Sequence, residues 1–161
     1  MRLLLVQHGD SVAESVDASR PLSAKGRREV EELARALRSF RGVDQPRQIL
    51  HSGKLRALQS AEILGEALGI PVRQSAGLDP LDPAGPFASD VETWDQSAIV
   101  VGHLPFLERL ASLLVADREE PSAVAFQRGG GVCLEKRETR AWTILWTFMP
   151  DQPKPWKGET H

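Results

Sequence analysis

The stretch LLLVQHGD, residues 3–10, joins an apolar run to a polar turn and decides the fold class. Residues 3–6 are continuously apolar rather than alternating, which is typical of a strand that helices cover on both faces in a parallel sheet. A second run of this kind, AIVV, occupies residues 98–101. We therefore expect two parallel strands inside an α/β sheet, each followed by polar residues at its carboxyl end.

Helical patterns alternate with short strands along most of the chain. Apolar residues spaced three and four apart predict helices over 23–40, 54–68 and 105–114. Ser23 is a suitable N-cap for the first helix, Gly42 follows its last turn, and Pro105 suits the first position of the third. Short strands are predicted at 48–51 and 72–74, so strand and helix follow each other in turn.

The later segments are a loop, a hairpin and a tail. Three prolines and two glycines between residues 77 and 86 predict a surface loop, with a short helix at 88–94 after it. Residues 132–136 and 142–148 predict an antiparallel hairpin at the sheet edge. We expect one domain over residues 1–150 and a loose tail over 151–161. The fold class is α/β, a three-layer α/β/α sandwich whose open sheet is mostly parallel and ends in this hairpin.

Composition excludes several classes of partner. Twenty Lys and Arg residues against 22 Asp and Glu residues give a net charge of −2, so no global positive field attracts nucleic acid or an anionic membrane. Cys133 is the single cysteine, which favours a reducing, cytoplasmic compartment. The apolar run before Gln7 is too short for a signal peptide, and no segment has the length of a membrane span. We expect a soluble cytoplasmic protein, with a monomer favoured.

Three predicted strands end in chemically active residues. The segments that follow them are QHGD at 7–10, SGKLR at 52–56 and GHL at 102–104. Because open α/β sheets bind ligands at the carboxyl ends of their strands, we expect His8, Arg56 and His103 to meet at one edge. Arg56 falls in the first turn of its helix, where the macrodipole disfavours a cation by roughly 0.3–1 kcal/mol. An anion bound there would make the position of Arg56 favourable instead of unfavourable. The same anion could also reach backbone N–H groups beside Leu104.

Four segments, in this order and at this spacing, resemble signatures of the histidine phosphatase (phosphoglycerate-mutase-like) superfamily. Residues 7–10 resemble its Arg-His-Gly, 20–26 its Arg-Pro-Leu-Thr/Ser-x-x-Gly, 52–61 its Ser-Pro-x-x-Arg-Ala-x-Gln-Thr-Ala, and 102–105 its Gly/Ser-His-x-Pro. The resemblance covers about residues 1–115. The short insert between Leu78 and Trp94 is most similar to the bacterial phosphohistidine phosphatases of that superfamily.

This resemblance implies phosphoryl transfer in two steps. His8 would attack phosphorus and carry the phosphoryl group as a phosphohistidine, while Arg56 and His103 stabilise the charge on its equatorial oxygens. The implied activity is a phosphatase without metal or other cofactor that dephosphorylates phosphohistidine in a protein. Further residues expected around the substrate are Gln7, Gly9, Arg20, Ser52 and Leu104.

Gln7 departs from the superfamily signature, which has an arginine in this place. A glutamine amide donates hydrogen bonds without charge, and charge-assisted bonds are about twice as strong as neutral ones. Exchanging one for the other in the transition state costs roughly 1.5–3 kcal/mol, or about ten- to a hundred-fold in rate. Arg20, Lys54 and Arg128 are the cations that could compensate.

The general acid is the second departure. Many members of the superfamily take a carboxylic acid from the loop after the third strand, which here offers Asp79 and Asp82, and we choose Asp82. An imidazole leaving group needs an acid less, because its own proton can be in place before transfer. A missing acid would therefore favour phosphohistidine over alkyl phosphate monoesters.

Two other functions remain open on the sequence alone. Gln7 raises the alternative of a catalytically weakened or inactive module that binds phosphate or phosphoprotein. A metallohydrolase using His8, Asp10, His51 and His103 is the third hypothesis. It has few carboxylates at strand ends, and Arg56 would repel the metal ion.

Each candidate also has a purely structural interpretation. His8 can be a satisfied polar group at a strand end, and Gly9 and Asp10 can serve the turn after it. Ser52 and His103 can cap the helices that follow them. Arg56 can pair at the surface with Glu62 or Asp79, and Asp79 is also the alternative acid.

Overall fold

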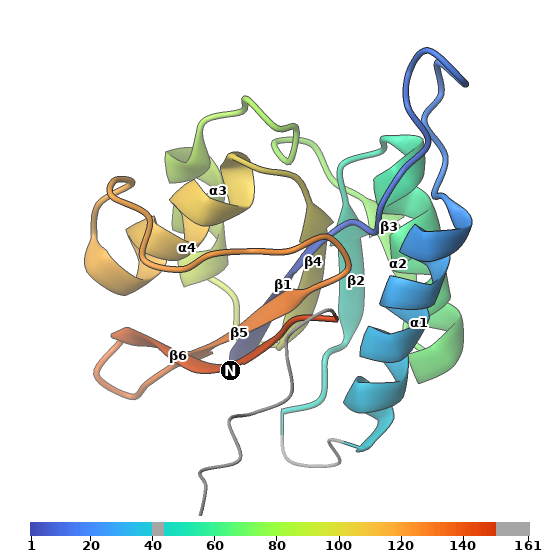
Figure 1. Ribbon diagram of the computed structural model, residues 1–161. Coiled ribbons are helices and arrows are strands. Elements are labelled where there is room, and N and C mark those ends of the chain that lie inside the picture. The colour runs from blue at the N-terminus through green and yellow to red at the C-terminus, as the bar shows by residue number, and fades with distance from the viewer. Residues whose placement is uncertain (40–43, 151–161) are drawn as a thin grey trace, which may run out of the picture.

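The computed structural model describes residues 1–39 and 44–150 and confirms the α/β fold class (Figure 1). Its elements follow the predicted alternation along the chain. They are β1 (Arg2–Gln7), α1 (Ala24–Ser39), β2 (Gln48–His51), α2 (Leu55–Leu68), β3 (Val72–Gln74), α3 (Ala84–Glu92), β4 (Ala98–Gly102), α4 (Phe106–Ala116), β5 (Gly131–Lys136) and β6 (Trp142–Phe148).

All six strands form one sheet, in the order β3-β2-β4-β1-β5-β6. The first four pair in parallel, whereas β5 runs antiparallel to β1 and to β6. The mostly parallel sheet and the C-terminal hairpin are therefore confirmed. The hairpin joins the sheet through β5, which places β1 between a parallel and an antiparallel neighbour.

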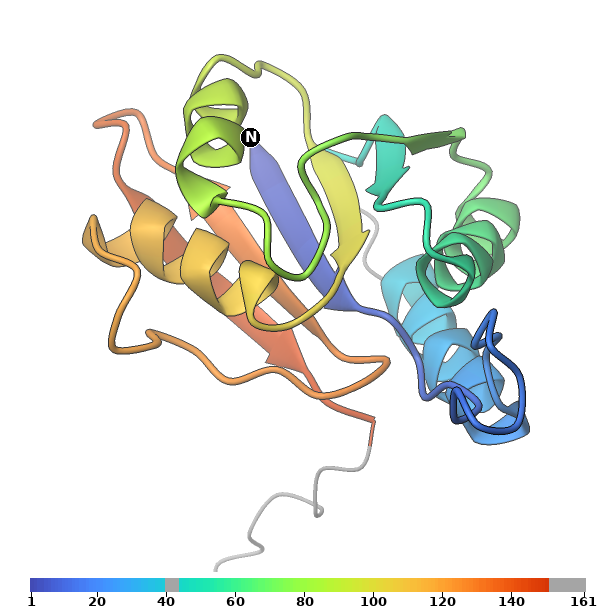
Figure 2. The same ribbon diagram turned by 90° about the horizontal axis from the view of Figure 1, so that it is seen from above.

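Helices cover both faces of the sheet, α3 and α4 on one side and α1 and α2 on the other (Figures 1 and 2). Successive residues of β1 serve the two faces in turn. Leu3 and Leu5 pack in the core under α3 and α4, and Leu4 and Val6 pack in the core under α1 and α2. This double coverage is the physical reason for the unbroken apolar run.

The chain leaves β1 and β4 toward opposite faces, although the two strands are neighbours. The helix after β1 is α1, and the helix after β4 is α4, which packs on the other face. Adjacent parallel strands whose connections diverge in this way leave a crevice at their carboxyl ends. The register pairs Gln7 with Gly102, so His8 and His103 both lie at that crevice.

Several predicted boundaries can be compared with the structure. Ser23 caps α1 as predicted, since its Oγ accepts a hydrogen bond from the Gly26 N–H at 3.0 Å. The predicted loop up to residue 86 and helix start at residue 88 were wrong, because α3 begins at Ala84. Pro86 is tolerated in this first turn, where backbone N–H groups have no intrahelical acceptor.

Three further expectations concern helix ends and membranes. Pro105 precedes α4 as its N-cap residue instead of occupying the first helical position. The predicted helix end at Phe40 and Gly42, like the tail over 151–161, lies outside the described residues. Across residues 1–39 and 44–150, no helix combines the length and apolar character needed to cross a bilayer.

Gly26 allows the start of α1 to approach the turn after β1 closely. A Cβ atom on Gly26 would overlap the backbone carbonyl of Asp10, and one on Gly9 would overlap the carbonyl of Gly26. Both neighbours are backbone atoms, which cannot rotate away as a side chain can. The two glycines therefore hold helix and turn in contact beside His8.

We predict that Gly26→Ala lowers the free energy of unfolding by about 1–3 kcal/mol, the usual cost of overpacking. Gly85→Ala is the matched control, because a Cβ there meets no atom within 4 Å and alanine favours a helix by about 0.5–1 kcal/mol. Urea unfolding of both variants measures the difference. Equal stability of the two variants would contradict the close contact.

Candidate functional site

The structure brings His8, Arg56 and His103 together from the ends of three strands. Nε of Arg56 lies 3.4 Å from Nε2 of His8. The rings of His8 and His103 have centroids 4.9 Å apart and are tilted by 53°. The predicted meeting of these three side chains at one edge is confirmed, although their separation in the chain is large.

A backbone contact selects the tautomer of His8. Its Nδ1 lies 2.7 Å from the carbonyl oxygen of Gly9, which can only accept, so Nδ1 carries the proton. Nε2 is then unprotonated, and its lone pair accepts the Nε–H of Arg56 at 3.4 Å. His8 as a residue is 7% exposed, and its backbone N–H donates to the carbonyl of Gly102 on β4 at 3.1 Å. His8 is therefore oriented with an unprotonated nitrogen toward the guanidinium.

His103 is held on one side only. Its Nε2 lies 2.6 Å from the hydroxyl of Ser52, while Nδ1 is buried and has no hydrogen-bond partner within the described chain. Ser52 also lies 3.4 Å from the backbone N–H of Lys54. Ser52 thus orients the second imidazole, a contact that neither of its predicted roles, helix cap or phosphate ligand, includes.

Burial makes both imidazoles weak bases. Desolvation lowers the pKa of His8 to about 4, opposed by its bond to Gly9 and reinforced by the charges of Arg56, Arg128 and Arg20. Desolvation also lowers the pKa of His103 to about 3, with further contributions from His8, Arg56, Lys54 and Arg20. Both rings are therefore neutral at pH 7 in the free protein, surrounded by positive charge.

Arg56 is anchored through the backbone of α2. The hydroxyl of Ser60 donates to the Arg56 carbonyl at 2.8 Å and accepts the N–H of Gly9 at 3.1 Å. This serine ties the helix that carries Arg56 to the turn that carries His8. Burial lowers the pKa of the guanidinium, and the charge of Arg20 lowers it further. A bound anion would relieve this accumulation of positive charge.

Gln7 ends β1 with a buried neutral side chain. The residue is 9% exposed, and its Oε1 atom is buried without a hydrogen-bond partner within the described residues. An unpaired buried acceptor costs roughly 1–3 kcal/mol. Position 7 therefore adds no positive charge to the site.

The remaining predicted residues lie in separate contacts around this centre. Arg20 donates to the Ser11 hydroxyl at 3.0 Å, and Lys54 lies 3.8 Å from Asp79. Asp82 accepts the Asp79 N–H at 2.8 Å, a bond within their own loop. This bond does not involve either imidazole, so the role of Asp82 as an acid stays a prediction.

The structure also shows where Leu104 and the four residues proposed as metal ligands lie. Leu104 is partly buried against the core under α3 and α4. Nδ1 of His51 accepts the Gly53 N–H at 3.1 Å. Among the described residues, no three His, Cys, Asp or Glu side chains form a group that could hold a metal ion. The four ligands proposed for a metallohydrolase, His8, Asp10, His51 and His103, are therefore not assembled into one site.

Sequence reasoning missed residues that support the turn after β1. Glu29 is buried in α1, and its Oε2 accepts the Asp10 N–H at 3.1 Å. The Gly129 N–H donates to the carbonyls of Gln7 and His8 at 3.0 and 3.1 Å. The run of three glycines at 129–131 was the only signal for this second contact, and a buried glutamate within a helix gave none.

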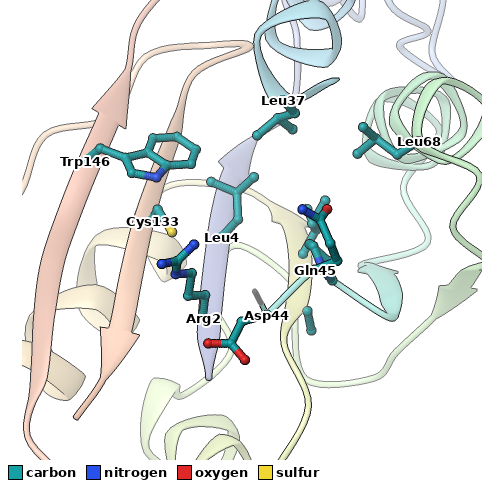
Figure 3. A pocket seen from close by; sticks show the side chains of 11 residues that line it. Arg2, Leu4, Leu37, Asp44, Gln45, Leu68, Cys133 and Trp146 are labelled. Carbon is teal, nitrogen blue, oxygen red and sulfur yellow. The ribbon is translucent and has the colours of Figure 1, made fainter. Parts of the chain in front are cut away.

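A pocket lies toward the other end of β1 (Figure 3). Its lining includes Arg2 and Leu4 of β1, Ala98 of β4 and Trp146 of β6. Arg2 and Ala98 begin their strands, whereas the two imidazoles follow the carboxyl ends of the same strands. The lining includes neither imidazole, so this pocket and the crevice are different places in the fold.

The chain belongs to the histidine phosphatase superfamily (branch 1), whose family model matches residues 3–83. Solved structures of similar fold include the protein histidine phosphatase SixA complexed with tungstate, 24% identical, with a TM-score of 0.81 over 93% of this chain and 97% of that one. A proposed phosphohistidine phosphatase SixA from Agrobacterium tumefaciens is 21% identical, with a TM-score of 0.76 over 92% and 97%. A mycobacterial glucosyl-3-phosphoglycerate phosphatase is 18% identical, with a TM-score of 0.68 over 89% and 96%. No curated protein matches the chain.

We predict that stability falls as the pH falls from 6.5 toward 4. In that window the unfolded chain binds protons at His8 and His103, whose ordinary pKa is 6.5, while the folded protein does not. Each imidazole contributes a loss of about 1 kcal/mol per pH unit. Urea unfolding at pH 6.5 and 4.5 should show a smaller loss for His103→Asn than for the unchanged chain, and equal losses would contradict the buried neutral ring.

Proposed function

We propose that this protein is a metal-independent phosphatase that forms a phosphohistidine on His8 and acts on phosphohistidine in a protein. The single observation that carries this proposal is the unprotonated Nε2 of His8, fixed by the bond from Nδ1 to the Gly9 carbonyl, beside the guanidinium of Arg56. A neutral imidazole in this orientation is a competent nucleophile toward phosphorus.

In the first step the Nε2 lone pair of His8 attacks phosphorus, and the bond from phosphorus to the leaving nitrogen breaks. Arg56 and a protonated His103 would donate to the equatorial oxygens as their charge develops. His103 suits this role because Nδ1 has no partner in the described chain, and a dianion would offset the desolvation that keeps the ring neutral. In the second step water attacks phospho-His8 and releases phosphate and the free imidazole.

Phosphohistidine is the substrate class that best suits this site with respect to proton donation to the leaving group. The Asp82 carboxylate is engaged with the Asp79 N–H in its own loop. A leaving imidazole can already carry the proton it needs, whereas an alkoxide needs a donor. The likeness in fold to SixA supports the same class, although structures of other phosphatases share this fold.

Charge argues against a catalytic metal ion at this centre. Arg56 stands 3.4 Å from the nitrogen of His8 that would have to coordinate the metal. A guanidinium repels a divalent cation and attracts a phosphoryl dianion. The neutral Gln7 favours a second function, a module that binds phosphoprotein with little or no turnover, and the next experiment separates the two.

We predict that incubation with a phosphohistidine protein in chelator gives an acid-labile phosphoenzyme and releases phosphate. His8→Asn should abolish the phosphoenzyme and lower turnover by about a thousand-fold or more, because the nucleophile is lost. The matched control is His51→Asn, another buried imidazole at a strand end, which should retain both signals. Binding without phosphoenzyme in the unchanged chain would favour the module, and loss of activity in chelator would favour a metal mechanism.

The low pKa of His8 predicts the pH dependence of the reaction. Only the unprotonated ring attacks phosphorus, so activity is lost as the pH falls through the pKa of His8 in the free enzyme, about 4. The acid limb of kcat/KM should therefore lie near pH 4 and not near the ordinary value of 6.5. A limb at pH 6–7 would show that the ring is not desolvated as the structure describes.

A further inference from the structure

Position 7 contributes no positive charge to the phosphate site. Gln7 carries a neutral amide, and its carbonyl oxygen is buried without a partner among the described residues. Arg56 is the guanidinium in hydrogen-bond contact with His8. A phosphoryl group in transfer carries negative charge on three oxygens, so a second cation would add to its stabilisation.

The turn before β5 brings Arg128 next to the backbone of the nucleophile. The N–H of the following residue, Gly129, donates to the carbonyls of Gln7 and His8, and Gly130 accepts the N–H of Gln7 at 3.1 Å. These bonds hold the turn against the end of β1. Arg128 therefore starts from a backbone that is in direct contact with residues 7 and 8.

The guanidinium of Arg128 is aimed back toward the turn that follows His8. Its Nη1 donates to Oδ1 of Asp10 at 2.6 Å, and Oδ2 of Asp10 accepts the Ser23 hydroxyl at 2.7 Å. The Arg128 side chain is 56% exposed, so it has room to rotate away from Asp10. An exposed ion pair contributes little stability, and a phosphoryl dianion would compete for the same planar donors.

The other two candidate cations, Arg20 and Lys54, already contact neighbouring groups. Arg20 donates through Nη2 to Ser11 and through Nε to the Val12 carbonyl, both in its own loop. Lys54 lies beside Asp79. Burial lowers the pKa of His8 most, and among the cations other than Arg56 the larger contribution comes from Arg128 rather than Arg20. Arg20 also acts on the pKa of Arg56 and of His103, so it is the backbone contacts of the turn, together with the existing bonds of Arg20, that select Arg128.

We propose that Arg128 is the second cationic ligand of the phosphoryl group and replaces in this chain the arginine that Gln7 displaces. Asp10 holds its guanidinium at the mouth of the site until the anion binds. This inference rests on the proposed function of the site, since it assigns a further substrate-binding residue to the same centre. Arg128, which lies 121 residues after Gln7, thereby supplies the positive charge that position 7 lacks.

Binding of inorganic phosphate to the full chain tests this assignment by calorimetry. Arg128→Ala should raise the Kd for phosphate about ten-fold or more, because one charge-assisted contact is lost. Arg128→Lys keeps the charge without the planar guanidinium, so its Kd for phosphate should lie between those of the unchanged chain and of Arg128→Ala. Arg2→Ala is the matched control, since it removes an arginine and its contact with Glu135 at the opposite end of β1, and it should leave the Kd unchanged.

Rescue by Gln7→Arg separates a ligand from a merely structural ion pair. In the Gln7→Arg background, Arg128→Ala should change the Kd less than about three-fold, because the arginine at position 7 supplies the charge. Thermal unfolding of each variant confirms that it is folded.

Three results would overturn the inference. They are an unchanged Kd for folded Arg128→Ala, an equal loss of affinity with and without Gln7→Arg, and a larger loss for Arg20→Ala than for Arg128→Ala. Phosphate binding that depends on Arg128 in a chain that forms no phosphoenzyme would support the inference and contradict the catalytic proposal. Failure of the Arg128 assignment can therefore be distinguished from failure of the proposed catalytic function.

Discussion

The parallel pairing of β1 with β4 is the constraint on which the site depends. Its register places Gln7 beside Gly102, and the His8 N–H bonds to the Gly102 carbonyl, so the two imidazoles follow neighbouring strand ends. The helices after these strands cover opposite faces of the sheet, which leaves the strand ends open. A shift of this register would separate His8 from His103 and would also reverse which face each core residue serves.

Desolvation gives this crevice its chemical character. Two neutral imidazoles and a guanidinium are held together, and burial lowers the pKa of all three. The folded protein holds these groups in place because Gly9, Ser52 and Ser60 anchor them through hydrogen bonds. The anchoring contacts preserve a site that is electrostatically incomplete until an anion enters it.

The chain is a histidine phosphatase by family, and its departures from the signature define what is particular to it. The buried amide of Gln7 brings no charge to the end of β1, while the turn at 127–130 bonds to the same backbone and carries Arg128, whose guanidinium pairs with Asp10. Related folds occur in phosphatases of different names, so the fold by itself does not identify a substrate.

The sequence alone determined the central strands, the helices and the meeting of His8, Arg56 and His103, because apolar periodicity and the residues directly after a strand are local features. It misjudged the start of α3, since prolines also fit the first turn of a helix. Only the tertiary structure decided the contacts of Glu29 and of Arg128, which lies 118 residues from its partner Asp10. Such contacts depend on how α1 and β5 lie beside β1, and no local pattern in the chain specifies that placement.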